Sequence, residues 1–116
     1  MIRNRTTGSI VAEKFEIADS FLAKLRGLTF RKKISKPLLF IFKSESRSRA
    51  SIHSLFMFFP FDAVFLDARK RIVDIRERIP PFTPLVVPLA RSKFLLEMGA
   101  GEARAKKLKI GDRLEW

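Results

Sequence analysis

The sequence contains no cysteine and no glutamine, and it has only one histidine and one asparagine. Without cysteine, disulfide bonds and thiolate metal sites are excluded, and a lone imidazole argues against a typical zinc site. The longest apolar stretch, Leu55 to Phe61, is far shorter than a membrane span, and the basic amino terminus lacks the apolar run of a signal peptide. These absences predict a soluble, cytoplasmic protein with no cofactor, no metal and no membrane contact.

The chain carries a large excess of positive charge. It has 24 basic and 12 acidic residues, a net charge of +12, and residues 1–50 alone account for 12 basic and 4 acidic residues. Many charges beside few thermolabile amides are common in proteins from hot environments. Two interpretations of the charge therefore stay open: a solvated surface of the thermophile type, or a surface that binds a polyanion.

Length and hydropathy predict one folded domain over residues 1–116, as a monomer or weak dimer. A chain of 116 residues, 47% hydrophobic, can bury a single sizeable core. Short apolar or alternating runs between turn residues indicate strands. The predicted strands are 9–17, 38–43, 52–59, 61–66, 71–75, 94–98 and 113–116.

The connections between these strands complete the prediction. Residues 67–70 join two strands as a hairpin, residues 44–51 form a loop, and the prolines of residues 80–88 give an irregular crossover. Helical spacing and caps predict short helices at 19–26 and 102–108. The fold class is thus mainly β, a β-sandwich or partly closed, jelly-roll-like barrel with one or two short helices. The side chains expected in its core include Phe40, Phe42, Phe56, Phe58, Phe65 and Leu96.

Three blocks of sequence resemble one known family. They are Leu25–Arg31 (LRGLTFR), Ile52–Asp67 (IHSLFMFFPFDAVFLD) and Phe94–Gly101 (FLLEMGAG), and Ile110-Gly111-Asp112 follows them. In this order they resemble the domain of unknown function 192 family, over nearly the whole chain. Three positions that carry tryptophan, lysine and asparagine in the family are phenylalanines in this chain, whereas Met57, Pro60 and Asp62 match the family. The resemblance implies a compact, mostly antiparallel β fold, and the family has no established activity.

The polar residues inside the apolar runs have two interpretations each. His53 is either a structural hydrogen-bonding residue or, with Asp62, a general acid–base pair. Asp62 either accepts backbone amides or pairs with Arg26 or Arg31, or else it orients a ligand. Strand alternation places Glu97 on an exposed face. The sequence has no G-x-S-x-G, phosphate-binding-loop or dinucleotide glycine pattern, so no motif supports catalysis, and whether the protein is an enzyme stays open.

Two functional hypotheses from different classes follow, and a metal-dependent hydrolase is a third. The first is a small-molecule or peptide binding module whose pocket is floored in part by Phe56 and Phe58 and rimmed by the basic loop. Its candidate ligand-binding residues are His53, Met57, Asp62, Arg26 and Arg31. The second is weak, sequence-nonspecific binding of nucleic acid or another polyanion. Its candidate residues are Arg31, Lys32, Lys33, Lys36, Arg47 and Arg49.

Overall fold

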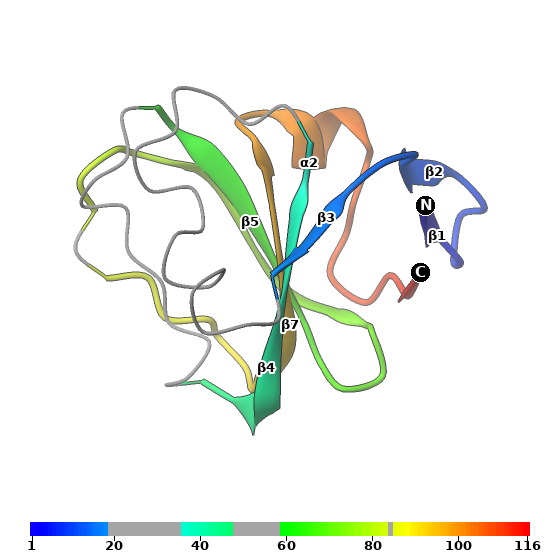
Figure 1. Cartoon of the computed structure of the whole chain (residues 1–116), viewed down its shortest axis with the longest axis horizontal. Helices are drawn as coiled ribbons and strands as arrows, with labels where there is room; N and C mark the ends of the chain where they lie inside the picture. Colours follow the sequence, from blue (N-terminus) through cyan, green and yellow to red (C-terminus); the bar gives the residue numbers. More distant parts are fainter. Residues whose placement is uncertain (19–35, 48–58, 84) are drawn as a thin grey trace.

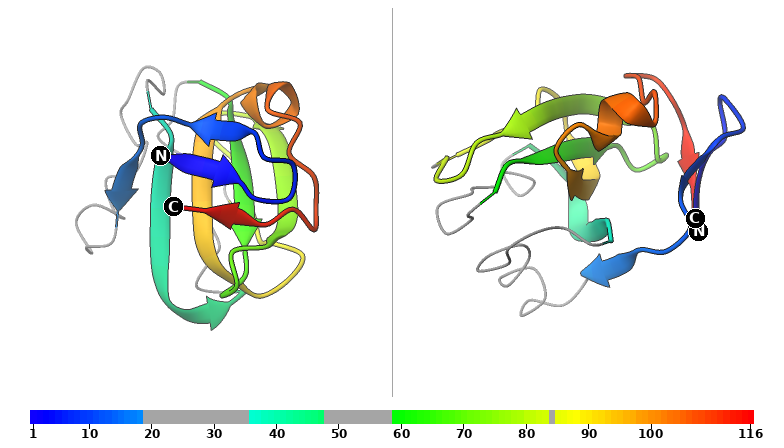
Figure 2. Two further views of the ribbon diagram at one scale, coloured as in Figure 1. Left: turned by 90° about the vertical axis from the view of Figure 1, so that its right-hand side faces the viewer. Right: turned by 90° about the horizontal axis from the view of Figure 1, so that it is seen from above.

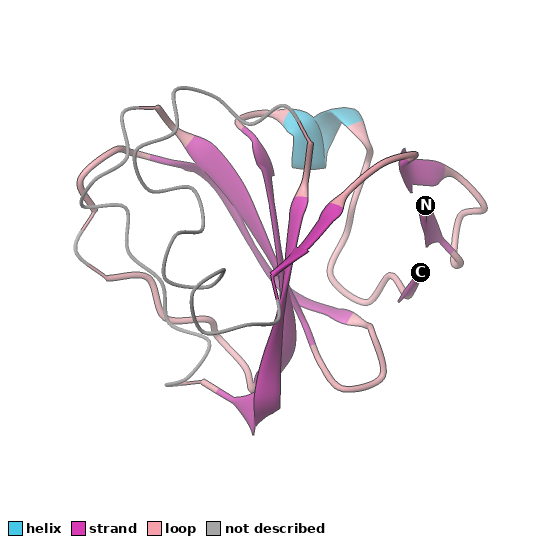
Figure 3. Cartoon of the chain, in the orientation of Figure 1, coloured by secondary structure: helices cyan, strands magenta, loops and turns pink. Residues whose placement is uncertain are grey.

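The computed structural model describes residues 1–18, 36–47, 59–83 and 85–116, and within these residues the chain is mainly β with one short helix (Figure 3). This confirms the predicted fold class. The strands are β1 (Ile2–Asn4), β2 (Ile10–Ala12), β3 (Glu16–Ala18), β4 (Leu38–Ser46), β5 (Phe61–Leu66), β6 (Ile72–Ile79), β7 (Ser92–Gly99) and β8 (Leu114–Glu115). The helix α2 spans Glu102–Ala105. It is not long and apolar enough to cross a membrane.

The strands form two sheets that face each other. The larger has the order β3-β4-β7-β5-β6 and the smaller the order β2-β1-β8. Figure 1 shows the large sheet nearly edge-on, with the small sheet on one side and residues 80–91 on the other. In the left view of Figure 2, turned by 90°, the small sheet lies in front and its strands run across the strands of the large sheet behind it. The large sheet is therefore covered on both faces, which explains the apolar runs in its strands.

The centre of the large sheet is built from β4, β7 and β5. β7 pairs antiparallel with both neighbours, for example through Leu96 with Leu39 on one side and Val64 on the other. β5 and β6 form the predicted hairpin, closed by the turn at Asp67, whose side chain accepts the backbone N–H groups of Arg69 and Arg71. An aspartate that folds back on its own turn in this way is a common hairpin closure.

The amino-terminal strands differ from the prediction. Residues 9–17 were expected as one strand, but they are divided between β2, which pairs with β1 in the small sheet, and β3, which pairs in parallel with β4. The chain leaves one sheet and enters the other at residues 13–15. An alternating pattern that continues through a change of sheet gives no signal of that change. β1 itself was not predicted, because three residues are too few to establish a period.

Other elements have shifted ends. β4 continues through Ser46, so the loop expected at residues 44–51 begins later, and β6 extends to Ile79. The helix expected at 102–108 ends at Ala105 and continues as a turn. The helix expected at 19–26 and residues 52–58 of the strand expected at 52–59 lie outside the described residues, and Phe59 lies in a bend.

Two apolar cores lie on opposite faces of the large sheet. The first, between the sheets, contains Leu39, Val64 and Leu96 and is partly covered by Trp116. The second contains Phe40 and Phe65. The predictions for Phe40, Phe65 and Leu96 are confirmed, whereas Phe42 is only half-buried and packs at the margin of the second core. Phe56 and Phe58 lie outside the described residues.

Candidate functional site

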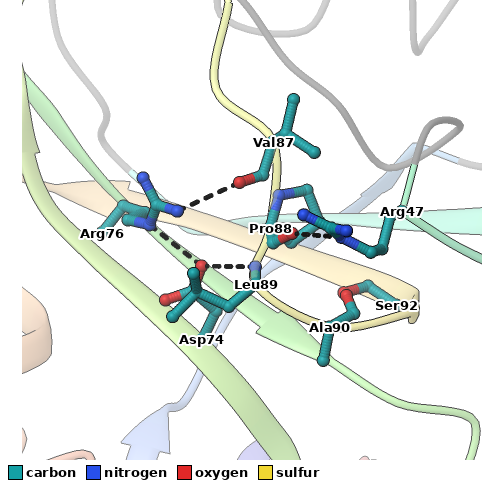
Figure 4. A network of polar contacts seen from close by, with 8 residues as sticks. All are labelled: Arg47, Asp74, Arg76, Val87, Pro88, Leu89, Ala90 and Ser92. Carbon is teal, nitrogen blue, oxygen red and sulfur yellow. Dashed lines mark hydrogen bonds and ion pairs between the residues drawn. The ribbon is translucent and has the colours of Figure 1, made fainter.

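The crossover of residues 80–91 lies on the second face of the large sheet and is held there by side chains. Asp74 is buried on β6, and one of its carboxylate oxygens accepts both the Leu89 backbone N–H at 3.0 Å and the Arg76 Nε–H at 2.9 Å. Arg76 also donates through Nη2 to the Val87 carbonyl at 3.0 Å (Figure 4). The ion pair thus fixes one backbone group on each side of Pro88.

Two further side chains complete this contact, which we call the crossover clamp: Arg47, Asp74, Arg76 and Ser92. Arg47 lies just beyond β4 and donates from Nε to the Pro88 carbonyl at 3.1 Å, and Ser92 Oγ donates to the Ala90 carbonyl at 3.0 Å. Each of the four consecutive residues 87–90 therefore has a backbone group that is hydrogen-bonded to a side chain of the surrounding strands or their margins (Figure 4). This satisfies backbone groups that the prolines and irregular path leave outside any ladder.

The crossover of residues 80–91 nevertheless exposes its largest apolar side chains. Phe82, Leu85 and Leu89 are 56%, 62% and 66% exposed, whereas Val86 between them is buried in the second core. We call these three exposed residues the apolar crest. Phe82 also has a φ of 63°, a left-handed conformation that is unusual for a bulky residue. Exposed apolar side chains that gather in one short segment are candidates for an interaction surface, and strained residues gather at functional sites.

Glu97 lies on the same face of the large sheet as the crossover. The prediction from strand alternation that Glu97 is exposed is wrong. The side chain is only 6% exposed, and its lateral neighbours on β4 and β5 are Leu38 and Ala63. Alternation predicts an exposed residue only when one face of the strand meets solvent, and both faces of β7 are covered. A carboxylate on a covered sheet face is stable only with polar partners inside the protein.

Asp62 is fully buried on the opposite face of the large sheet. Its contacts are those of the structural interpretation, in which the carboxylate accepts backbone amides. Its carboxylate accepts the backbone N–H groups of Arg78, Gly101 and Ala103 at 2.8, 3.0 and 2.9 Å. Arg78 has a positive φ at an irregularity of β6, and the other two groups belong to the first turn around α2. One side chain therefore joins β5, β6 and α2. Its role as a ligand-binding candidate stays a prediction.

The other predicted site residues divide into two sets. His53, Met57, Arg26, Arg31, Lys32, Lys33 and Arg49 lie outside the described residues. Lys36 and Arg47 are described, and both have partners: Lys36 Nζ is 3.4 Å from Glu16 Oε1, and Arg47 belongs to the crossover clamp. The part of the chain that the structure describes holds no group of three or more carboxylates or imidazoles placed to bind a metal ion.

Comparison with known proteins agrees with this architecture. The family described as "Uncharacterized ACR" (DUF192) matches residues 2–116. The chain belongs to the DUF192 family. UPF0127 proteins of Thermococcus sibiricus and Pyrococcus furiosus are 34% and 35% identical to it, over 100% and 97% of the chain and 74% and 95% of their own lengths.

Two solved structures have the same fold. A protein of unknown function from Novosphingobium aromaticivorans superposes with a TM-score of 0.80 at 22% identity, over 88% of this chain and 74% of that one. A putative transcription regulator from Sinorhizobium meliloti superposes with a TM-score of 0.79 at 23% identity, over 87% and 79%. At such identities the similarity establishes the fold alone. The DUF192 fold is thus a scaffold whose functional surface must be sought in the side chains of each member.

Proposed function

We propose that this DUF192 protein is a binding module for a small molecule or short peptide, and that the ligand docks on the apolar crest. The observation that supports this most strongly is the combination of three exposed apolar side chains, Phe82, Leu85 and Leu89, with the side-chain clamp beneath them. Scattered apolar residues on a surface need no explanation, but three within one eight-residue segment do.

The clamp gives the crest the rigidity that a binding surface needs. Binding is weakened by the entropy of ordering flexible segments, so a surface held in place before the ligand arrives binds more tightly. Arg76 and Asp74 fix the backbone at Val87 and at Leu89, which is itself a crest residue. The part of the crest around Leu89 is therefore preorganised even though it lies outside the sheet.

Polar groups near such a surface orient the ligand. Binding sites are mostly apolar with a few placed polar groups. The predicted ligand-binding residues His53 and Met57 belong to the same hypothesis.

Native mass spectrometry of the freshly purified protein tests the proposal. We expect a species of constant mass bound to the wild-type chain and lost from the double variant Leu85→Ser/Leu89→Ser. Ile10→Ser/Ile110→Ser is the control, because Ile10 and Ile110 are 42% and 62% exposed, so this variant also removes two exposed apolar side chains, away from the crossover. A species retained equally by both variants would place the binding surface away from the crest.

A further inference from the structure

Three arginines that are far apart in the sequence lie side by side on the outer face of the molecule. Arg71 and Arg113 pair directly across an antiparallel bridge. Arg5 follows β1 and donates its backbone N–H to the Arg113 carbonyl at 2.7 Å, which continues the register in which Asn4 pairs with Leu114. We call Arg5, Arg113 and Arg71 the arginine row; it crosses three neighbouring chain segments.

The row points toward solvent. The residues next to it, Asn4, Leu114 and Ile72, are buried, whereas Arg5, Arg71 and Arg113 are exposed. Successive side chains of an extended segment point to opposite sides, so the three guanidinium groups share the outward side.

The hydrogen bonds bring two of these arginines especially close. The Leu114 N–H donates to the Lys70 carbonyl and the Ile72 N–H to the Asp112 carbonyl, so Arg71 and Arg113 form a non-hydrogen-bonded pair. In such a pair the Cα atoms are about 4.5 Å apart and the side chains are closer than elsewhere in a ladder. Like charges directly opposite each other are destabilising. The fold thus holds together two charges that repel.

Acidic groups compensate this charge only in part. Asp67 Oδ2 is 3.6 Å from Arg71 Nε, and that arginine remains half exposed. Asp112 adjoins Arg113 in sequence but points inward, where it accepts the Asn4 side-chain amide and the Lys109 backbone N–H. The three segments around the row, residues 1–9, 67–71 and 102–116, contain ten basic and four acidic residues, a net charge of +6. A quarter of the chain therefore carries half of its net charge.

We infer that the arginine row binds the phosphodiester backbone of nucleic acid, without regard to base sequence. Guanidinium groups bind phosphate oxygens in a bidentate manner, and the charge repulsion within the row is relieved when an anion lies across it. Neighbouring segments are about 4.8 Å apart, so the row is roughly 10 Å long. One strand of a duplex presents a phosphate about every 3.4 Å along its axis, so two to three phosphates lie within that length. This surface is separate from the apolar crest.

The test is fluorescence anisotropy with a labelled 20-base-pair DNA duplex, a duplex RNA of the same sequence and a scrambled DNA duplex, between 50 and 200 mM salt. We expect binding that weakens steeply with salt and differs little between the sequences. Each phosphate contact contributes about 0.9 to the slope of log affinity against log salt. The variant Arg5→Ser/Arg71→Ser/Arg113→Ser should therefore lose about two to three units of slope.

A charge-matched control separates the site from the net charge. The variant Lys43→Ser/Arg78→Ser/Arg91→Ser removes three exposed basic side chains of the large sheet and its margins, with the same change in net charge. We expect it to keep most of the wild-type slope. Equal losses in the two triple variants would overturn the inference, and so would binding of heparin or anionic vesicles without binding of any of the three duplexes. The single variant Arg113→Ser, expected to lose about one unit, repeats the test with a minimal change to the fold.

Discussion

Asp62 illustrates how much of this fold depends on single polar side chains. Its carboxylate satisfies three backbone N–H groups from β6 and the start of α2, and the side chain is fully shielded from water. A buried carboxylate is stable only with such partners. The residue therefore acts as a joint that attaches α2 to the β5–β6 hairpin.

We expect Asp62→Ala to destabilise the protein strongly. Each donor left without a partner costs about 1–3 kcal/mol, so a loss of about 3 kcal/mol or more in the free energy of unfolding is predicted. Urea titration measures it. Glu77→Ala is the control, because Glu77 pairs with Arg104 at the surface and such pairs contribute about 0–1 kcal/mol. A loss no larger than that of the control would contradict the role of Asp62 as a joint.

The arginine row predicts an unusual gain in stability. Arg113→Thr removes the like charge opposite Arg71. In the absence of nucleic acid, we expect this variant to be more stable at 20 mM salt by about 0.2–1 kcal/mol. The gain should largely disappear at 1 M salt, because the Debye length falls to about 3 Å. Thermal unfolding at the two salt concentrations measures it, and a salt-independent loss of stability would contradict the repulsion.

Single residues also show the limits of sequence analysis. The two interpretations of Asp62 could be stated in advance because a carboxylate in an apolar run must have partners. Glu97 was assigned to the wrong environment because alternation does not report how many faces of a strand are covered. The arginine row could not be predicted, because residues 5, 71 and 113 meet only through the pairing of the chain's ends with the β5–β6 turn.

At the scale of elements, the crossover is the segment on which the functional proposal depends. It has few strand partners and is attached through Asp74, Arg76, Arg47 and Ser92. Local stability should therefore depend on these side chains rather than on a sheet ladder.

We expect Asp74→Ala to loosen the crossover more than the rest of the fold. The substitution leaves the Leu89 N–H without its acceptor and frees Arg76 from its ion pair. Hydrogen exchange of amides 85–91 should become faster by roughly tenfold or more, which corresponds to about 1.4 kcal/mol of lost local protection. Arg104→Ala, which breaks only an exposed pair, is the control. Unchanged exchange at residues 85–91 would show that the clamp does not hold the segment.

The strands and turns that the sequence predicts correctly are those whose signals lie within a few neighbouring residues. The β5–β6 hairpin and the irregular crossover followed from turn residues and prolines, and both are present. The division of residues 9–17 between two sheets was not predicted, because the decision depends on distant partners, β1 and β4. The parallel pairing of β3 with β4 likewise depends on tertiary contacts, and the sequence of neither strand predicts it.

At the scale of the whole molecule, one sheet separates two apolar cores. Leu96 contributes to the core between the sheets and Leu95, its neighbour on β7, to the core beneath the crossover. The aromatic content of the sequence correctly predicted that both faces are covered. The identity of the covering segments, the small sheet on one side and the crossover on the other, became visible only in the structure (Figures 1 and 2).

Leu96→Ala tests the central position of β7. The side chain is fully buried, so the cavity left by the substitution should cost about 2–5 kcal/mol of unfolding free energy. Ile110→Ala, at an exposed position, should change it by no more than about 0.5 kcal/mol. Denaturant titration of both variants measures the difference, and similar values would contradict the assignment of the core.

The apolar crest is the proposed ligand-binding surface of the molecule. Hydrogen–deuterium exchange tests it most directly, by comparing the freshly purified protein with the same protein unfolded in guanidinium to remove bound species and refolded. We predict slower exchange in the freshly purified protein at residues 85–91, with little change at residues 102–116. Equal exchange at residues 85–91, or protection confined to residues 1–12 and 102–116, would contradict the claim.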